Sequence, residues 1–302
     1  MSKKIGWIGT GVMGTSMCMH LLKAGNKAFI YNRTKSKAKD LIAEGAVWCK
    51  SPAEVAQQAD IIFTIVGYPR DVEETILGQN GVLANADKGK IIVDMTTSEP
   101  ALAERIAMKA SAKGVESLDA PVSGGDVGAR DATLAIMVGG AETTFDKVKD
   151  LFKVMGENIQ YRGPSGAGQH TKMCNQILIA GTIVGTVESL FYAYKAGMDL
   201  DEVIDVIGSG AAASVCVNGL GRRIASGDYN PGFYIKHFIK DMGIALNEAK
   251  RMNISLPGLA LADRVYSFAI DLGYEDLGIQ GLFKVFEKCD LNKQIVLDHN
   301  TK

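Results

Sequence analysis

Short apolar segments alternate with helix-patterned segments along the first half of the chain. The apolar segments are rich in β-branched and aromatic residues and lie at Ile5–Ile8, Ala28–Tyr31, Ile61–Val66, Ile91–Asp94, Val115–Leu118 and Leu134–Val138. Between them, segments such as Lys35–Glu44 and Leu102–Lys113 have helical periodicity. Continuous apolar strands separated by helices are typical of a parallel sheet that is covered on both faces. The pattern therefore predicts an α/β domain with a largely parallel sheet.

The pattern changes after about Gly166, where strand-like segments become rare. Helical periodicity then covers Gln169–Lys195, Leu200–Ile207, Val215–Ala225, Lys236–Arg251, Leu259–Asp271 and Leu277–Lys288. Glycines follow several of these segments, as expected at helix C-termini. We therefore predict two domains, an α/β domain over residues 1–165 and an all-α domain over residues 166–302, joined by the long helix that begins near Gln169.

One apolar stretch, Ile177–Phe191, carries Gly181 and Gly185 at a spacing found in pairs of membrane helices. Glu188 interrupts it, and the uncharged run is shorter than the ~20 residues that span a bilayer. We therefore predict a core helix in which the glycines permit close packing, and no membrane partner.

Composition excludes several classes of function. The chain is 47% hydrophobic and 22% charged, which is ordinary for a globular protein, and its net charge of -1 offers no basic surplus for nucleic acid. The five cysteines are scattered without a C-x-x-C pair, and no secretory signal precedes Ile5. We therefore expect a reducing, cytoplasmic location, no disulfide framework and no metal site.

A glycine-rich turn follows the first predicted strand and precedes a predicted helix. It reads Gly9-Thr10-Gly11-Val12-Met13-Gly14, the spacing G-x-G-x-x-G. In such a turn the first glycine allows the tight bend, the second lets the backbone approach a pyrophosphate, and the third lets the helix pack closely on the strand. The strand–turn–helix context predicts a Rossmann domain that binds a nicotinamide dinucleotide.

The end of the second strand bears on the choice of cofactor. NAD-specific sites place a carboxylate there, but this chain reads Asn32-Arg33-Thr34, whose side chains can donate to a 2′-phosphate. We therefore predict NADP, with NAD as the alternative. Arg33 as a solvated loop charge is the other interpretation of this segment.

Candidate catalytic residues lie at the start of the long helix. Lys172, Asn175 and Gln176 have the spacing i, i+3, i+4, so they share one face of an otherwise apolar helix. A desolvated lysine is suited to proton transfer, whereas the competing interpretation is a lysine that merely extends to solvent at the helix entrance. Upstream, the loop Asp119–Gly125 contains Ser123, whose hydroxyl and neighbouring backbone N–H groups can hold a carboxylate.

Together, these segments resemble the β-hydroxyacid dehydrogenase family, which includes 3-hydroxyisobutyrate dehydrogenase, tartronate semialdehyde reductase and the glyoxylate/succinic semialdehyde reductases. Four motifs appear in the family's order, and the resemblance covers nearly the whole chain. They are the glycine turn with Leu21–Gly25, then Asp119–Gly125, Gly166–Gln176 and Gly232–Asp241.

The resemblance implies a role for each matching residue. Lys172 would be the general acid/base, and Asn175 would position substrate and lysine. The substrate would be bound by Ser123, Gly124, Gly125, Phe233 and Asp241. The cofactor would contact Gly9, Gly11, Val12, Met13, Gly14, Asn32, Arg33, Thr34, Val66, Thr96 (or Thr97) and Lys240. The family further implies an active site in a cleft and a homodimer or homotetramer.

The departures from the family pattern concern the substrate more than the chemistry. Asn32-Arg33-Thr34 resembles the glyoxylate and succinic semialdehyde reductases, whereas Asp119–Gly125 with Asn175-Gln176 is closer to tartronate semialdehyde reductase. We therefore expect an NADP-dependent oxidoreductase that interconverts a small semialdehyde or keto acid and its hydroxy acid. The alternatives are an NAD-dependent 3-hydroxyisobutyrate dehydrogenase, an imine reductase, which the presence of Lys172 disfavours, and a non-catalytic cofactor-binding scaffold.

Overall fold

The computed structural model describes residues 2–288, so the end of the predicted all-α domain, including Cys289, lies outside the described residues. Contacts divide the chain into two compact units, Met1–Asn175 (unit 1) and Gln176–Lys302 (unit 2). The division falls within the long helix α9 (Ala167–Lys195). The sequence suggests a boundary at 165/166, just before this helix, and that boundary stays a prediction. In the structure, the first turns of α9 have their contacts in unit 1.

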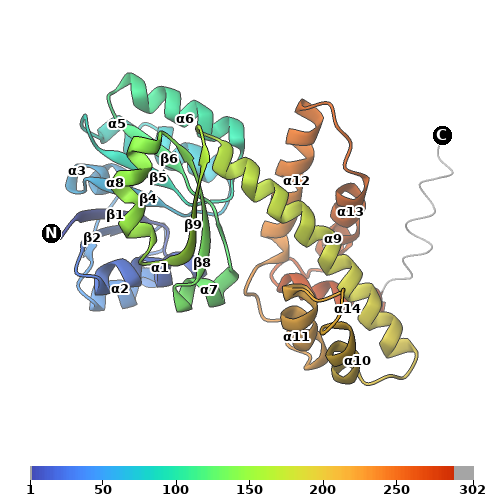
Figure 1. Ribbon diagram of the computed structural model, residues 1–302. Coiled ribbons are helices and arrows are strands. Elements are labelled where there is room, and N and C mark those ends of the chain that lie inside the picture. Colours follow the sequence, from blue (N-terminus) through green and yellow to red (C-terminus); the bar gives the residue numbers. More distant parts are fainter. Residues whose placement is uncertain (1, 289–302) are drawn as a thin grey trace. The chain divides into compact units, whose positions relative to one another are not determined.

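Unit 1 is built on one sheet, whose strands lie side by side in Figure 1. The strand order is β3-β2-β1-β4-β5-β6-β8-β7, with β9 paired to β8. Every pair from β3 through β6 is parallel, whereas β8 is antiparallel to β6 and β7. The strands are β1 (Lys4–Ile8), β2 (Lys27–Tyr31), β3 (Val47–Trp48), β4 (Ile61–Thr64), β5 (Ile91–Asp94), β6 (Glu116–Asp119), β7 (Val122–Ser123), β8 (Leu134–Gly140) and β9 (Gly156–Gly163). The predicted largely parallel sheet is confirmed.

Helices cover the sheet on both faces, as the alternation of buried residues along β4 shows. Phe63 belongs to a core cluster with Met17 and Val148, whereas its neighbour Ile62 belongs to a second cluster with Val55. The helices of unit 1 are α1 (Val12–Lys23), a 3-10 turn η1 (Lys35–Ala38), α2 (Lys39–Ala43), α3 (Pro52–Gln58), α4 (Pro69–Leu77), α5 (Val82–Asn85), α6 (Pro100–Ala112), α7 (Gly125–Asp131) and α8 (Glu142–Phe152). Two apolar layers on opposite faces of one sheet define a doubly wound domain.

Unit 2 is helical over its described residues, which confirms the predicted all-α texture. It contains the rest of α9, then α10 (Leu200–Ile207), a π-helical turn η2 (Cys216–Gly221), α11 (Arg222–Ala225), α12 (Ile235–Arg251), α13 (Pro257–Asp271), a 3-10 turn η3 (Ile279–Gly281) and α14 (Leu282–Lys288). Helices α12 and α13 pack through Phe238 and Tyr266, whose rings meet edge to face at 5.2 Å. The hydroxyl of Tyr266 donates to the carbonyl of Ile279 at 2.8 Å, so this buried phenol is satisfied.

Helix α9 corrects one expectation about its glycines. Gly181 and Gly185 lie on its exposed face, and a Cβ at either position would meet no heavy atom within 4 Å. The prediction that they permit close packing inside the core is therefore wrong for the described chain. By length and composition alone, α9 is long and apolar enough to cross a membrane, and 39% of its most apolar 18-residue stretch is buried. Core helices of soluble proteins have the same length and composition, so these properties are weak evidence for a membrane span.

Candidate active site

The three glycines of the turn between β1 and α1 have three different surroundings. Gly9 has φ +103°, and a Cβ there would lie 2.0 Å from the carbonyl oxygen of Ile65, so only glycine fits. A Cβ at Gly14 would lie 2.1 Å from the carbonyl oxygen of Gly9, so α1 packs directly on the turn. At Gly11, by contrast, a Cβ would meet nothing within 4 Å. The packing of the described chain therefore does not require Gly11, and the space beside it is open to a ligand's approach.

The N-terminus of α1 suits the phosphates of a dinucleotide. Gly11 is its N-cap residue and supplies no side-chain hydrogen bond, and the first turn carries no acidic residue. Val12, the first helical residue, is 48% exposed, whereas Met13 packs against the core. The N–H groups and the positive end of a helix attract anions, so the turn fits a pyrophosphate.

The segment after β2 is shaped by Asn32. Its Oδ1 accepts the N–H of Thr10 at 3.2 Å and its Nδ2 donates to the carbonyl of Thr34 at 2.9 Å. Asn32 therefore joins the glycine turn to the loop that carries Arg33. The Arg33 side chain is 78% exposed, and its Nη1 lies 3.4 Å from Oδ1 of Asp71 in the first turn of α4. Because the arginine of this pair is largely in solvent, the contact contributes little to stability, and the guanidinium can turn toward a ligand.

Thr96 and Val66 follow two neighbouring strands, β5 and β4, and are hydrogen-bonded to each other. The N–H of Val66 donates to Oγ1 of Thr96 at 3.0 Å, and the N–H of Thr96 donates to Oδ1 of Asp94 at 3.1 Å. Because β1, β4 and β5 are parallel neighbours, these residues and the glycine turn lie at the same edge of the sheet. This edge, at the carboxyl ends of the strands, is where doubly wound sheets bind ligands.

Ser123 and Asn175, which are 52 positions apart, come together in unit 1. The hydroxyl of Ser123 donates to Oδ1 of Asn175 at 3.1 Å. Gly124 and Gly125 follow with φ +133° and +64°, conformations that glycine adopts without strain. The loop from β7 into α7 is thereby fixed to helix α9 at its third turn.

Lys172 lies three positions before Asn175 on α9 and is only 6% exposed. The interpretation of this lysine as one that extends freely to solvent is therefore wrong. Residues three apart in a helix share a face, so Lys172 and Asn175 present an ammonium and an amide on the same side. An ammonium that is largely removed from water beside polar groups can exchange a proton with a bound oxygen.

The remaining candidates belong to unit 2 and cluster at the start of α12. Nε2 of Gln176 donates to Oδ2 of Asp241 at 2.7 Å, and Nζ of Lys240 lies 2.8 Å from Oδ1 of the same carboxylate. Asp241 is 1% exposed, so its buried charge is neutralised and hydrogen-bonded. Phe233 packs its ring edge to face on Phe238 at 5.6 Å. The substrate and cofactor roles expected for Phe233, Lys240 and Asp241 stay predictions.

The structure adds two polar residues to which the sequence pattern assigns no role. Gln169 is fully buried and Asp119 is 3% exposed, and both make hydrogen bonds around the first turn of α9. Gln169 is three residues before Lys172, so the spacing that grouped Lys172 with Asn175 and Gln176 extends backward to include it. This helical spacing was the sequence signal from which Gln169 could have been added to the candidate site.

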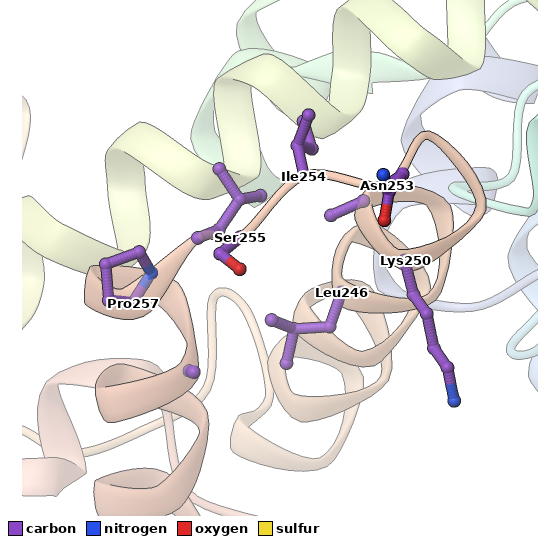
Figure 2. Close-up of a pocket in the computed structure, with 9 residues that line it drawn as sticks. Leu246, Lys250, Asn253, Ile254, Ser255 and Pro257 are labelled. Carbon is purple, nitrogen blue, oxygen red and sulfur yellow. The ribbon is translucent and has the colours of Figure 1, made fainter.

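An open pocket of about 530 Å³ lies in unit 2, where α12 ends and α13 begins. Figure 2 shows the labelled side chains that line it, Leu246, Lys250, Asn253, Ile254, Ser255 and Pro257. It contains none of the predicted site residues. Within residues 2–288, no group of three or more His, Cys, Asp and Glu side chains could hold a metal ion.

The sheet edge, the glycine turn and the buried lysine define a nicotinamide-dependent oxidoreductase, and comparison with known proteins agrees. Residues 4–163 match the NAD binding domain of 6-phosphogluconate dehydrogenase, and residues 166–286 match the NAD-binding domain of NADP-dependent 3-hydroxyisobutyrate dehydrogenase. Together the two matches cover almost all of the described chain.

Individual relatives give the same result. The chain is 51% identical over 288 residues to "probable 3-hydroxyisobutyrate dehydrogenase-like 1, mitochondrial" of Arabidopsis thaliana, covering 95% of this chain and 86% of the relative. It is 38% identical over 284 residues to the 2-hydroxy-3-oxopropionate reductase of Escherichia coli, covering 94% and 97%. The crystal structure of 3-hydroxyisobutyrate dehydrogenase from Salmonella typhimurium superposes with a TM-score of 0.87 at 27% identity, covering 94% of this chain and all of that one.

The chain belongs to the β-hydroxyacid dehydrogenase family. By class it is an NAD(P)-dependent oxidoreductase of hydroxy acids, which confirms the resemblance stated on the four motifs.

Proposed function

We propose that this protein is an NADP-dependent reductase of a small semialdehyde or keto acid, with Lys172 as the general acid. The observation that carries the proposal is a buried Lys172 on the same helix face as Asn175, whose Oδ1 accepts a hydrogen bond from the hydroxyl of Ser123. One helix face thus offers a proton donor next to a loop suited to a carboxylate. Both belong to the unit that also holds the open glycine turn.

In this mechanism the protein's residues orient the substrate and move one proton. Ser123, Gly124 and Gly125 bind the substrate carboxylate through a hydroxyl and backbone N–H groups. Asn175 positions the substrate, and Lys172 donates its proton to the carbonyl oxygen during reduction and accepts it during oxidation. The bound cofactor supplies the hydride.

The preference for NADP rests on Arg33 and on the absence of an acidic residue at positions 32–34. A guanidinium can hold a 2′-phosphate with two hydrogen bonds, whereas a carboxylate at this place would repel the phosphate. The family match of residues 166–286 to the domain of an NADP-dependent enzyme supports the same choice.

A homodimer or homotetramer is part of the proposal, and the exposed face of α9 supports it. Leu178 and Tyr192 on this face are 72% and 75% exposed, and Gly181 and Gly185 lie between them. Exposed apolar side chains flanking small residues suit a second copy of the chain. Sedimentation at several protein concentrations tests this, since a monomer throughout would contradict it. The cytoplasmic location stays a prediction.

The decisive experiment is a kinetic panel with both cofactors. Succinic semialdehyde, tartronate semialdehyde and glyoxylate are offered with NADPH or NADH, and 3-hydroxyisobutyrate with the oxidised forms. We expect saturable turnover of at least one of them, with NADPH favoured over NADH. No turnover with any substrate would overturn the reductase, and an NADH preference above about tenfold, equivalent to ~1.4 kcal/mol, would overturn the cofactor assignment.

A further inference from the structure

Gln169 joins the lysine-bearing helix to the loop after β5. Its side chain has no exposed surface, and it lies in the first turn of α9, three residues before Lys172. Oε1 accepts the N–H of Ser98 at 3.0 Å, and Nε2 donates to the carbonyl of Thr96 at 2.8 Å. The amide thus binds one donor and one acceptor of the same short loop, which fixes its orientation.

Thr96 continues this connection to the loop after β4. Its Oγ1 accepts the N–H of Val66, and the next N–H back, that of Ile65, donates to the carbonyl of Ile8 at 2.9 Å. Ile8 immediately precedes Gly9 of the glycine turn. An unbroken series of short contacts therefore leads from α9 to the edge of the sheet where the cofactor turn lies.

Asp119 anchors the same helical turn from the other side. Its Oδ1 accepts the N–H of Gly166 at 2.8 Å and its Oδ2 accepts the N–H of Gln169 at 2.9 Å. A carboxylate at this place satisfies N–H groups that a helix start otherwise leaves unpaired, and it interacts favourably with the helix dipole.

Two glycines let the chain close around this carboxylate. A Cβ at Gly168 would lie 2.4 Å from the carbonyl oxygen of Met137, and one at Gly139 would lie 2.6 Å from Oδ1 of Asp119. Strand β8 and the first turn of α9 therefore approach too closely for any side chain. The backbone at the start of α9 therefore cannot move closer to β8.

We infer that Gln169 and Asp119 are positioning residues, which hold the first turn of α9 so that Lys172 keeps one fixed place relative to the loops after β4 and β5. Gln169 holds the helix by hydrogen bonds to the loop that contains Thr96, and Asp119 holds it by hydrogen bonds from the end of β6. Neither residue is required to touch the substrate. The inference rests on the proposed role of Lys172, and it adds the residues that fix the geometry of that role.

The physical reason is the steep dependence of proton and hydride transfer on geometry. A displacement of about 1 Å can lower the rate of a catalysed step on the order of 100-fold. Gln169 is therefore expected to act on kcat, while binding of the cofactor at the glycine turn stays nearly unchanged.

The test uses Gln169→Glu, which keeps the size of the side chain and changes one donor into an acceptor. At a pH where the new carboxyl is ionised, it cannot donate to the carbonyl of Thr96, and we expect kcat to fall roughly 10- to 100-fold. When protonated, the carboxyl again offers one donor and one acceptor. Activity relative to wild type, measured at each pH, should therefore recover as the pH falls. Taking the ratio to wild type removes the titration of Asp94 and Asp119, which occurs in both proteins.

Gln169→Leu is the companion variant, since it has no titratable group and should show no recovery at low pH. Gln160→Glu is the matched control, because Gln160 is exposed on β9 and its side chain donates to Asn158 of the same strand. The dissociation constant of NADPH, measured by fluorescence, should change by less than about threefold in Gln169→Glu, or under ~0.7 kcal/mol. A kcat close to that of wild type at all pH values, or a loss without recovery at low pH, would overturn the inference.

Failure of the proposed function would look different. If wild type turned over none of the substrates, the reductase proposal would fail. The anchoring would still be measured by amide hydrogen exchange of residues 166–173, which needs no turnover. Gln169→Leu should then accelerate exchange in this segment but not in α12, and equal protection in both proteins would overturn the anchoring itself.

Discussion

The hydroxyl of Ser123 donates a hydrogen bond to the side-chain oxygen of Asn175 at 3.1 Å, across 52 positions of sequence. The bond fixes the amide group so that its N–H side can face a substrate. It also shows that the loop after β7 and the helix bearing Lys172 form one polar surface within unit 1.

Replacing Ser123 with alanine should impair substrate binding more than turnover. The variant loses the single O–H donor of Ser123, which bonds Asn175 in this structure and would turn to the substrate carboxylate once that group is bound. A hydrogen bond to a charged group contributes about 1.5–3 kcal/mol, so kcat/KM should fall roughly 10- to 100-fold, mainly through KM. Steady-state kinetics measure this, with Ser189→Ala at an exposed position of α9 as the control. An unchanged KM would exclude Ser123 from carboxylate binding.

Removing the amine of Lys172 should abolish most of the turnover and leave the cofactor bound. General acid catalysis by a positioned side chain contributes about 10²- to 10⁴-fold, so Lys172→Ala should lower kcat by a factor in or above that range. NADPH titration by fluorescence should give a dissociation constant close to that of wild type. Lys195→Ala, at the exposed end of the same helix, is the control for loss of a lysine. A reduction in kcat below tenfold would remove Lys172 from the role of general acid.

Arg33 should discriminate between the two cofactors. Its guanidinium is exposed and only weakly paired with Asp71, so it is available to a 2′-phosphate. Arg33→Ala should lower kcat/KM for NADPH roughly 10- to 100-fold, the range of a charged hydrogen-bonded pair, and barely change that for NADH. Arg105→Ala removes an arginine that pairs elsewhere, with Glu73, and should change neither. Equal losses for both cofactors would indicate a structural role instead.

The sequence was sufficient for the parts of the fold that have a continuous apolar pattern. The cores of β1, β2, β4 and β5 were predicted nearly to the residue because both faces of these strands are buried. Strand β9 was missed because its residues, Gly-Glu-Asn-Ile-Gln-Tyr-Arg-Gly, alternate between exposed and half-buried positions. It pairs with one neighbour, β8, so no buried apolar run marks it.

The candidate site was predictable to the extent that its residues recur at fixed spacing. Lys172 and Asn175 follow from helical periodicity, but the bond from Ser123 to Asn175 depends on the tertiary fold. Gln169 has the same helical spacing, three residues before Lys172, but the sequence does not show that its side chain is buried, and no such spacing marks Asp119. Only the structure shows that their partners, Thr96, Ser98 and Gly166, lie within hydrogen-bond distance.

Asp94 gives a prediction for the dependence of stability on pH. It is 5% exposed at the end of β5, and its Oδ1 accepts the hydroxyl of Thr64 at 2.8 Å and the N–H of Thr96 at 3.1 Å. Burial, with a smaller contribution from the nearby carboxylate of Asp119, raises the pKa of its carboxyl to about 6, although these hydrogen bonds oppose the shift. The folded protein therefore binds this proton more tightly than the unfolded chain, whose carboxyl titrates near pH ~3.9.

The contribution of Asp94 to the free energy of unfolding should consequently fall as the pH rises from about 4 to about 6, because ionising Asp94 is easier in the unfolded chain. A shift of roughly two pKa units corresponds to at most ~3 kcal/mol. Asp94→Asn keeps the acceptor oxygen for Thr64 and Thr96 and removes the titration. Urea denaturation at pH values across this range should therefore show wild type losing stability relative to Asp94→Asn. Asp60→Asn, at an exposed position before β4, is the control that should track wild type. A difference between wild type and Asp94→Asn that stayed constant with pH would show that the Asp94 carboxyl titrates alike in the folded and unfolded states.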